Sequence, residues 1–460
     1  MQSNTGPGNT PAVTRRELWS WAFYDFANSG YTTVVLTTIY SAYFVGVMAA
    51  ELEAESPGSG TLLWTSATAL ANFIVLLSAP VVGAIADHRA SKKRFLLLST
   101  ITCVGATALL ALAAPGQLWL ALPLLVLSAV AFANGENLIA AFLPEIASSG
   151  NMGRISGYGW SLGYFGGLLT LGLCLAYITW ASGLGQAARA YVPVTLFITA
   201  IIFALTALPT FLWLRERAVP VPLLPGGSYV REGFDKVKQT LRHAAQLPDL
   251  FRFLLCQTIN QAGVATVVVI AAIYAQEVMG FDSQQLIVLI MVVNFTAAVG
   301  AFAFGYAQDR FGSVPSLACA LLVWIAAGVV TLLADSTGDF WFAGNLMGLA
   351  MGATQAGGRA LIGEFTPVER TGEFFGLWGF SARTAAIIGP LSYGVISSLS
   401  GGDHRLALLS TLSFFIVGVL LLLTVNEERG LAAKTHATCT SPVKLLELRH
   451  GCDLCSANSL

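Results

Sequence analysis

The sequence predicts an all-α membrane protein whose twelve transmembrane helices form two six-helix bundles. Three observations predict it: an apolar composition, twelve long apolar runs, and an internal repeat. Of the 460 residues, 55% are hydrophobic and only 11% are charged, whereas a soluble protein has about 25% charged residues. Most of the chain therefore cannot face water, which excludes a disordered chain or a disulfide-rich module. The net charge of −1 offers no basic surface for nucleic acid.

Each of the twelve apolar runs is long enough to cross a bilayer, because a helix needs about 20 residues to span the hydrocarbon core. The runs are continuous rather than alternating, which indicates helices and not the strands of a barrel. The predicted spans are residues 18–48, 62–86, 95–114, 117–142, 155–180, 191–214, 251–276, 284–307, 314–334, 340–363, 373–399 and 405–425.

Basic residues fall mainly on one side of these spans. If the N-terminus is cytoplasmic, 20 of the 24 Lys and Arg residues lie in cytoplasmic segments, while Arg189 and Arg405 lie on the opposite side. Positively charged loops stay in the cytoplasm, so both termini are expected there. In a bacterium, the expected location is the inner membrane.

Polar segments divide the chain into five parts. A tail at 1–17 precedes the first bundle, 18–214, and the central connection at 215–250 precedes the second bundle, 251–425. Within the connection, Val230, Phe234, Val237 and Leu241 recur at helical spacing and predict an amphipathic helix on the cytoplasmic surface. Residues 426–460 are expected to form a disordered cytoplasmic tail.

The two halves carry matching residues at nearly constant offsets. The pairs are Gly83 and Gly305, Asp87 and Asp309, Glu145 and Glu364, Gly157 and Gly376, and Asn28 and Asn260. Several matches in corresponding spans indicate a six-helix repeat. Helical bundles built from repeats, with a site near the midplane, are typical of secondary transporters.

Four sequence motifs resemble known families. The segment GAIADHR at 83–89, followed by KKR at 92–94, resembles the loop signature of the major facilitator superfamily, with His88 and Ala90 where that pattern usually has Arg and Gly. More specific are WAFYDFANS at 21–29, FLPEI at 142–146 and GRISGYGWSLGY at 153–164. They resemble the vacuole-effluxer, or autophagy-related permease, family and its bacterial members. This resemblance implies the major facilitator fold, with helices one, four, seven and ten around a central cavity. It also implies amino acid export from the vacuole for fungal members.

Four ionisable residues lie well inside the spans: Asp25, Glu136, Arg359 and Arg383. A charge at the centre of a span costs about 2.5–3.5 kcal/mol on insertion scales, so four charges facing lipid would cost about 10–14 kcal/mol. Two acids and two bases can neutralise one another. They are therefore expected to face each other or a cavity.

The candidate residues for substrate binding or proton coupling combine these charges with nearby amides: Asp25, Asn28, Glu136, Asn137, Asn260, Gln355, Arg359 and Arg383. The amides could equally join helices to one another. Asp25 could be a gate residue, and Arg383 could pair with Glu136 for folding alone. The hypothesis is that a small polar or zwitterionic solute, such as an amino acid, binds by its carboxylate to Arg359. Glu136 or Asp25 would meet its amine or carry a coupling proton.

A second set of residues is expected to form a cytoplasmic gate: Gly83, Asp87, Arg89, Glu145, Asp309, Arg310 and Glu364. Asp87 ends a span and could approach the positive N-terminus of another helix. Arg89 and the basic run 92–94 could pair with acids such as Glu145. The alternative for 92–94 is that these residues only supply the positive charge of a cytoplasmic loop.

Other functions are less compatible with the sequence. The chain has no G-x-x-x-x-G-K-[ST] loop for ATP, and all five histidines lie outside the spans, which argues against an enzyme acting on lipid. A monomeric secondary transporter without metal or cofactor is expected. The alternative is a sensor or scaffold that kept the transporter fold. A measurement of solute flux distinguishes the two, because a scaffold moves no solute. Cys452 and Cys455 have C-x-x-C spacing in the tail without a second pair.

Overall fold

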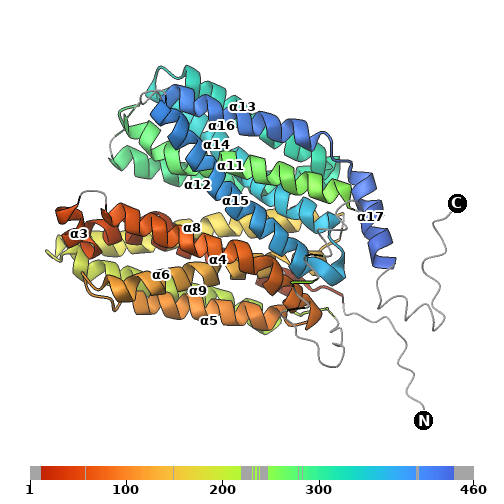
Figure 1. Cartoon of the computed structure of the whole chain (residues 1–460), viewed down its shortest axis with the longest axis horizontal. Coiled ribbons are helices and arrows are strands. Elements are labelled where there is room, and N and C mark those ends of the chain that lie inside the picture. The colour runs from red at the N-terminus through yellow and green to blue at the C-terminus, as the bar shows by residue number, and fades with distance from the viewer. Residues whose placement is uncertain are drawn as a thin grey trace, which may run out of the picture.

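The computed structural model describes residues 12–56, 59–148, 150–218, 231, 234–235, 238, 247–277, 279–281, 283–399 and 404–439. This part of the chain is helical and contains no strand. Its long helices run side by side in two groups, one from each half of the sequence (Figure 1).

Helices of the N-terminal half form the first bundle. They are α1 (Arg15–Tyr31), η1 (Thr32–Thr37), α2 (Ile39–Tyr43), η2 (Phe44–Met48), α3 (Ala50–Glu55), α4 (Ser59–His88), α5 (Lys92–Leu110), α6 (Leu118–Ala140), α7 (Leu143–Ile146), α8 (Met152–Gly183) and α9 (Ala188–Trp213). A continuous apolar core that includes Trp21, Tyr31, Leu125 and Phe203 holds this bundle together.

Helices of the C-terminal half form the second bundle. They are α11 (Pro248–Glu277), α12 (Ser283–Phe311), α13 (Ser313–Leu333), α14 (Thr337–Phe365), η4 (Val368–Arg370), α15 (Thr371–Leu399) and α16 (His404–Leu422), followed by α17 (Glu427–Cys439). Its core includes Phe253, Trp324, Phe365 and Phe415. The two cores are distinct clusters, and they adjoin where Ala360 of α14 belongs to the first and Ala140 of α6 to the second.

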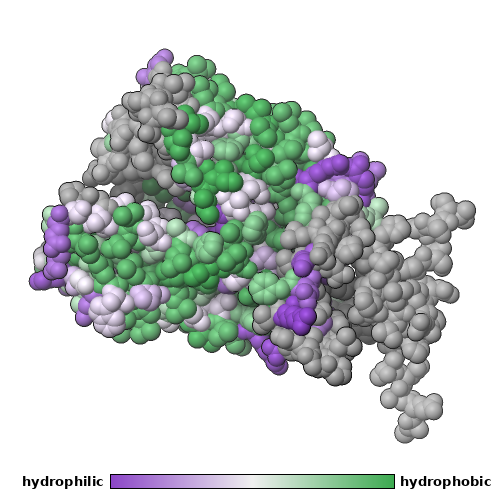
Figure 2. Space-filling view, viewed as in Figure 1, coloured by the Kyte–Doolittle hydropathy of each residue, from purple (hydrophilic) through white to green (hydrophobic). Residues whose placement is uncertain are grey.

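Each predicted span overlaps one of these helices, and the count of twelve membrane crossings stays a prediction. By length and composition, eight helical segments in the described part of the chain can cross a membrane, or nine if the pair bent by 65° between α16 and α17 counts as one span. The first predicted span, 18–48, is interrupted by the π-helical segments η1 and η2 rather than continuous. Large apolar side chains cover much of the surface of both bundles (Figure 2), as a lipid-facing surface requires.

The structure differs from the prediction at the C-terminal tail. Residues 427–439, expected to be disordered, form α17, which packs against α11 and α14. Residues 440–460, with Cys452 and Cys455, lie outside the described residues. So does most of the predicted amphipathic helix, of which Arg231, Phe234, Asp235 and Lys238 are described and helical.

Contact between the bundles is made mainly by α8 with α12 and by α4 with α15. The bundles converge at the end of the molecule that carries α17, called here the α17 end (Figure 1). Glycines allow this approach: a Cβ added at Gly83 would overlap the carbonyl of Gly372 in α15, and one at Gly157 would overlap the carbonyl of Ala301 in α12. Ala90, in the turn between α4 and α5, has a φ of 46°, which explains why glycine is usual at this position of the motif.

Helix α8 also packs closely on α1, and its glycines set that distance as well. We expect Gly166→Leu to lower the melting temperature of the purified protein, because a side chain at Gly166 would overlap the backbone carbonyl of Phe26. Overpacking of this kind costs about 1–3 kcal/mol. The matched control is Gly172→Leu on the same helix, where an added Cβ meets no atom within 4 Å. Equal melting temperatures for the two variants would contradict this account of the packing.

Candidate functional site

A buried ion pair joins the two bundles. Arg359 of α14 donates from Nη1 to Oδ2 of Asp25 in α1 at 2.6 Å. The two residues are 3% and 9% exposed, so both charges are almost completely withdrawn from solvent. Each charge neutralises the other, as predicted for charges inside spans, although the pairing of Arg359 with Asp25 in particular was not predicted.

The other groups around Arg359 come from the first bundle. Its Nε donates to Oγ of Ser156 at 3.1 Å, and its Nη2 donates to the Ser156 carbonyl at 2.9 Å. The guanidinium carbon lies 4.8 Å from the ring centre of Trp21 and 5.4 Å from that of Trp160, within the range of cation–π attraction. Gly159 makes room for this arrangement, because a Cβ there would overlap both Asp25 and Arg359.

A second ion pair also crosses between the bundles. Arg383 of α15 donates to Glu136 of α6 at 3.1 Å and to the side-chain oxygen of Asn72 in α4 at 3.3 Å. Their side chains are more accessible than those of the first pair: 20% for Arg383 and 29% for Glu136, against 4% for Arg359 and 11% for Asp25. A polar solute can therefore reach Glu136 and Arg383 more readily than Asp25 and Arg359.

Of the amide side chains predicted for the site, Asn28, Asn137 and Asn260 are buried, and each has a side-chain atom without a hydrogen-bond partner, as does the neighbouring Gln257. Gln261 donates to Gln355 at 2.6 Å. The unpartnered atoms are Oδ1 of Asn28, Nδ2 of Asn137, Oδ1 of Asn260 and Nε2 of Gln257. Buried polar atoms are seldom left unpaired in proteins, so these amides offer donors and acceptors to a solute. Gln261 of α11 and Gln355 of α14 do join two helices, which is the alternative role for such residues.

At the α17 end, two aspartates each bind the N-terminus of a helix in the other bundle. Asp87 of α4 accepts from the backbone N–H groups of Gly372 and Glu373, both at 2.9 Å, in the first turn of α15. Asp309 of α12 accepts from Gly153 at 2.8 Å and Arg154 at 3.2 Å, in the first turn of α8. The predicted approach of Asp87 to a positive helix N-terminus is present, and the repeat duplicates it at Asp309.

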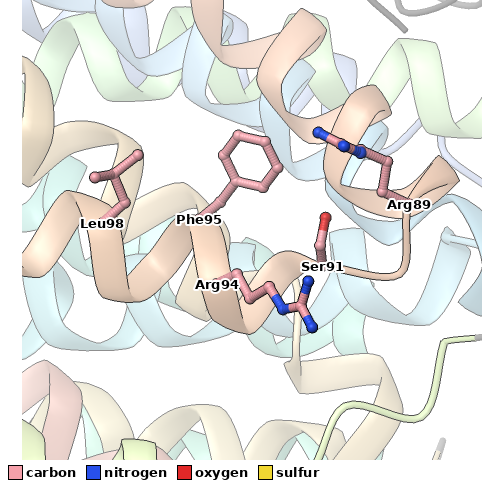
Figure 3. A pocket seen from close by; sticks show the side chains of 5 residues that line it. All are labelled: Arg89, Ser91, Arg94, Phe95 and Leu98. Atoms are coloured by element: carbon pink, nitrogen blue, oxygen red, sulfur yellow. The ribbon is translucent and has the colours of Figure 1, made fainter.

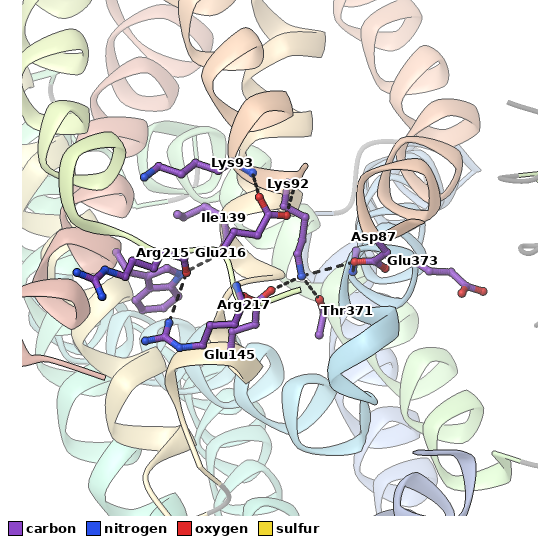
Figure 4. Close-up of polar contacts among 12 residues, drawn as sticks. Asp87, Lys92, Lys93, Ile139, Glu145, Arg215, Glu216, Arg217, Thr371 and Glu373 are labelled. Carbon is purple, nitrogen blue, oxygen red and sulfur yellow. Dashed lines mark hydrogen bonds and ion pairs between the residues drawn. The ribbon is translucent and has the colours of Figure 1, made fainter. Parts of the chain in front are cut away.

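Lys92 forms the centre of a buried network beside Asp87 (Figure 4). Its ammonium group pairs with Glu145, lies 3.5 Å from Asp87, and donates to Oγ1 of Thr371 in α15 at 2.6 Å. Lys92 is 0% exposed. The alternative reading of 92–94, as mere loop charge, is therefore wrong for Lys92.

The equivalent position in the second half lacks a lysine. Ser313 occupies it and donates from Oγ to Glu364 at 2.8 Å, while Lys434 of α17 donates to the Glu364 backbone carbonyl at 2.9 Å. The repeat therefore matches in geometry but not in charge. One acid is buried against an ammonium group and the other against a hydroxyl group.

Acids outside the predicted motifs extend the repeat. Glu216 binds the N-terminus of α5 through the backbone N–H groups of Lys92 and Lys93, and Glu427 binds the N-terminus of α13 through Ser313 and Val314. Burial raises the pKa of Glu216, which lies in the connection after α9, above its ordinary value. In each bundle, an acidic residue that follows the sixth long helix thus binds the N-terminus of the third long helix.

The remaining predicted gate residues lie at the surface or in tight packing. Gly83 touches the Gly372 backbone. Arg89 lines a surface pocket beside the α4–α5 turn (Figure 3), and the Arg310 guanidinium lies 5.5 Å from the ring centre of Phe311. Arg154, which was not predicted, binds Asp309 from Nε at 2.7 Å.

Sequence reasoning missed several contributors to both regions. Trp21, Ser156 and Trp160 stood in the family motifs without a role, and Asn72 was not singled out. One available signal was helical spacing, because Trp21 and Asp25 are four residues apart and share a face of α1. No group of three or more His, Cys, Asp or Glu residues in the described ranges is arranged to hold a metal ion.

The Lys92 network leads to a prediction about stability. Lys92→Met leaves the carboxylates of Glu145 and Asp87 buried without their cation, and removing one partner of a buried ion pair typically costs 3–5 kcal/mol. We expect a clear loss of thermal stability in the purified protein. Arg15→Met, at an exposed position of the same end, is the control and should change stability by less than about 0.5 kcal/mol. Similar melting curves for both variants would show that the network contributes little.

Comparisons with known proteins agree with this architecture. A family model described as "Vacuole effluxer Atg22 like" matches residues 61–435. The uncharacterised MFS-type transporter YxiO of Bacillus subtilis (strain 168) is 28% identical over 412 residues, which cover 89% of this chain and 94% of YxiO. Autophagy-related protein 22 of Cryptococcus neoformans is 26% identical over 295 residues, covering 60% of this chain and 53% of the fungal protein. The chain thus spans about half the length of that fungal relative.

Solved structures with the same fold are major facilitator transporters. The human organic anion transporter MFSD10 (TETRAN) superposes with a TM-score of 0.72 at 16% identity, covering 89% of this chain and 99% of that one. The transporter FucP in its outward conformation gives a TM-score of 0.69 at 16% identity, covering 90% and 99%. The fold is that of the major facilitator superfamily, and the relatives indicate an integral membrane protein that transports small molecules. The chain belongs to the vacuole effluxer Atg22-like family.

Proposed function

We propose that this protein is a secondary active transporter that moves a small zwitterionic solute, such as an amino acid, by alternating access. One observation carries the proposal: two acid–base pairs, Asp25 with Arg359 and Glu136 with Arg383, each join the first bundle to the second. The four charges neutralise one another only while the bundles stay together at this point.

The pairing explains why the solute should carry both charges. If the bundles separate around Arg359, the guanidinium loses Asp25, and each partner is left as a poorly solvated single charge. A solute carboxylate can replace Asp25 on the guanidinium through a planar two-point contact. Its amine can replace the guanidinium on Asp25 or Glu136. A zwitterion therefore supplies both counter-charges at once.

Access to the site is unequal at the two ends of the molecule. At the α17 end, the side chains of Asp87, Lys92 and Asp309 are at most 8% exposed, whereas those of Glu136 and Arg383 remain partly accessible. These features favour a conformation closed at the α17 end and open toward the opposite end. The excess of basic residues on this side supports a cytoplasmic position for the α17 end and for both termini. In a bacterium, this orientation gives an outward-open state in the inner membrane.

Proton coupling is proposed through Glu136. Among the four central charges, its side chain is the most accessible to solvent, and a carboxylate in a membrane site can take up and release a proton as access alternates. The protein is proposed to work as a monomer, because each chain contains both bundles and the whole pathway between them.

The proposed function is tested first by binding and flux. The purified protein should be stabilised against heat by some zwitterionic amino acids and not by the corresponding amines or amides, which lack one charge. The same solutes should be taken up by proteoliposomes, and a pH gradient should change the rate. Stabilisation without any flux would favour the scaffold alternative.

Arg359→Lys tests the binding role. The lysine keeps the charge but cannot hold Asp25 and Ser156 together as the planar guanidinium does. We expect the affinity for the solute found in the screen to fall at least tenfold in a binding titration. Arg189→Lys, at an exposed position of α9, is the control. Unchanged affinity in Arg359→Lys would remove this residue from the binding site.

Glu136→Gln tests the coupling role. The amide keeps the size and a hydrogen-bond acceptor for Arg383 but cannot carry the proton. We expect proton-driven uptake into proteoliposomes to be lost, while counterflow, which needs no net proton movement, continues. If both activities match those of the unmodified protein, Glu136 is not part of the coupling mechanism.

A further inference from the structure

A pocket of about 260 Å³ lies beside the turn between α4 and α5, apart from the central ion pairs. Arg89, Ser91, Arg94, Phe95 and Leu98 line it (Figure 3). The first bundle forms this pocket by itself, and the proposed transport mechanism does not use it.

The polar part of the pocket is suited to an anion. Figure 3 shows the guanidinium groups of Arg89 and Arg94 on either side of the Ser91 hydroxyl. Ser91 is only 8% exposed, and its Oγ has no hydrogen-bond partner. The pocket therefore combines two cations with a buried hydroxyl that can donate to an oxygen of a ligand. Paired guanidinium groups of this kind recognise phosphate oxygens well.

The backbone at the start of α5 does not compete for that anion. The N–H groups of Lys92 and Lys93 already donate to Glu216 at 2.6 and 3.2 Å. Binding would depend on the side chains of Arg89, Ser91 and Arg94. Substitution of these side chains can therefore remove binding without altering the cap of the helix.

The apolar part of the pocket continues along the outer face of α5. Arg94, Leu98 and Ile101 are spaced i, i+4 and i+7, so they share one face of the helix. Leu98 and Ile101 are each 61% exposed and lie where the helix enters the apolar surface. The face thus begins with a cation and continues as an exposed apolar stripe, an arrangement that matches a phosphate group joined to an acyl chain.

We propose that this pocket binds the phosphate headgroup of an anionic phospholipid, with an acyl chain lying against Leu98 and Ile101. A soluble phosphate compound shares the headgroup chemistry but would gain nothing from the apolar stripe. The volume suits a headgroup, not a whole lipid, which would extend along the helix into the bilayer. The site lies on the lipid-facing side and requires no opening of the central pathway.

Native mass spectrometry of the delipidated, detergent-purified protein tests the proposal. Phosphatidylglycerol should bind at least tenfold more tightly than phosphatidylcholine, and R89Q/R94Q should abolish that preference. Arg215→Gln is the matched control, because it removes one exposed arginine of the same end outside the pocket. Ser91→Ala should weaken phosphatidylglycerol binding without changing the melting temperature.

Two further binding measurements distinguish a phospholipid ligand from a soluble phosphate compound. Leu98→Asn keeps every polar group and should weaken phosphatidylglycerol binding, and millimolar glycerol phosphate should fail to displace the lipid. Efficient displacement by glycerol phosphate, with full binding in Leu98→Asn, would overturn the lipid assignment. Equal binding of phosphatidylglycerol by the unmodified protein and R89Q/R94Q would overturn the site itself.

Discussion

The cost of charge in a membrane protein is the constraint on which the rest of this structure depends. Asp25 and Arg359 are buried between the bundles, and either alone would be strongly unfavourable there. They come from different bundles, so the same contact that makes the charges tolerable also holds the two halves together. Ser156 and two tryptophans complete the surroundings of the guanidinium. A solute that replaces one partner of such a pair alters the contact between the bundles directly.

The α17 end uses a related principle with different chemistry. Asp87 and Asp309 join the bundles by accepting hydrogen bonds from helix N-termini, where the macrodipole favours a negative charge. These two contacts are related by the internal repeat, but the acids behind them differ: Glu145 has Lys92, whereas Glu364 has Ser313. The two contacts thus have the same geometry, but the group that binds the glutamate is charged in one and neutral in the other. The ion pair of Lys92 with Glu145 lies within the first bundle, and the ammonium group adds one hydrogen bond between the bundles, to Thr371 of α15.

Much of the fold could be predicted because a helix that crosses a lipid bilayer must be long and apolar. Long apolar runs gave helices at the predicted positions, and the offsets of Gly83, Asp87 and Glu145 correctly indicated a repeat. The charged residues of the site could be predicted because a buried charge needs a partner. Spacing along one helix does not say which other helix supplies that partner. Hence all four charges were singled out and a pair of Arg383 with Glu136 was considered, while the pair of Asp25 with Arg359 needed the structure. Two roles stayed open for Lys92, because a basic residue after a span has the same sequence signature whether it faces water or a buried acid. The tail helix α17 has too weak an apolar pattern to stand out.

The most direct test of the account is a pair of distances between the bundles, measured by double electron–electron resonance. With native cysteines replaced by serine, spin labels at Gln186 and Thr337 report the end opposite α17, and labels at Arg15 and Arg310 report the α17 end. Addition of the transported solute should shift the distribution at the first pair toward shorter distances and that at the second toward longer ones. Unchanged distributions at both pairs, in protein that still transports the solute, would contradict a mechanism in which the bundles rock around the central ion pairs.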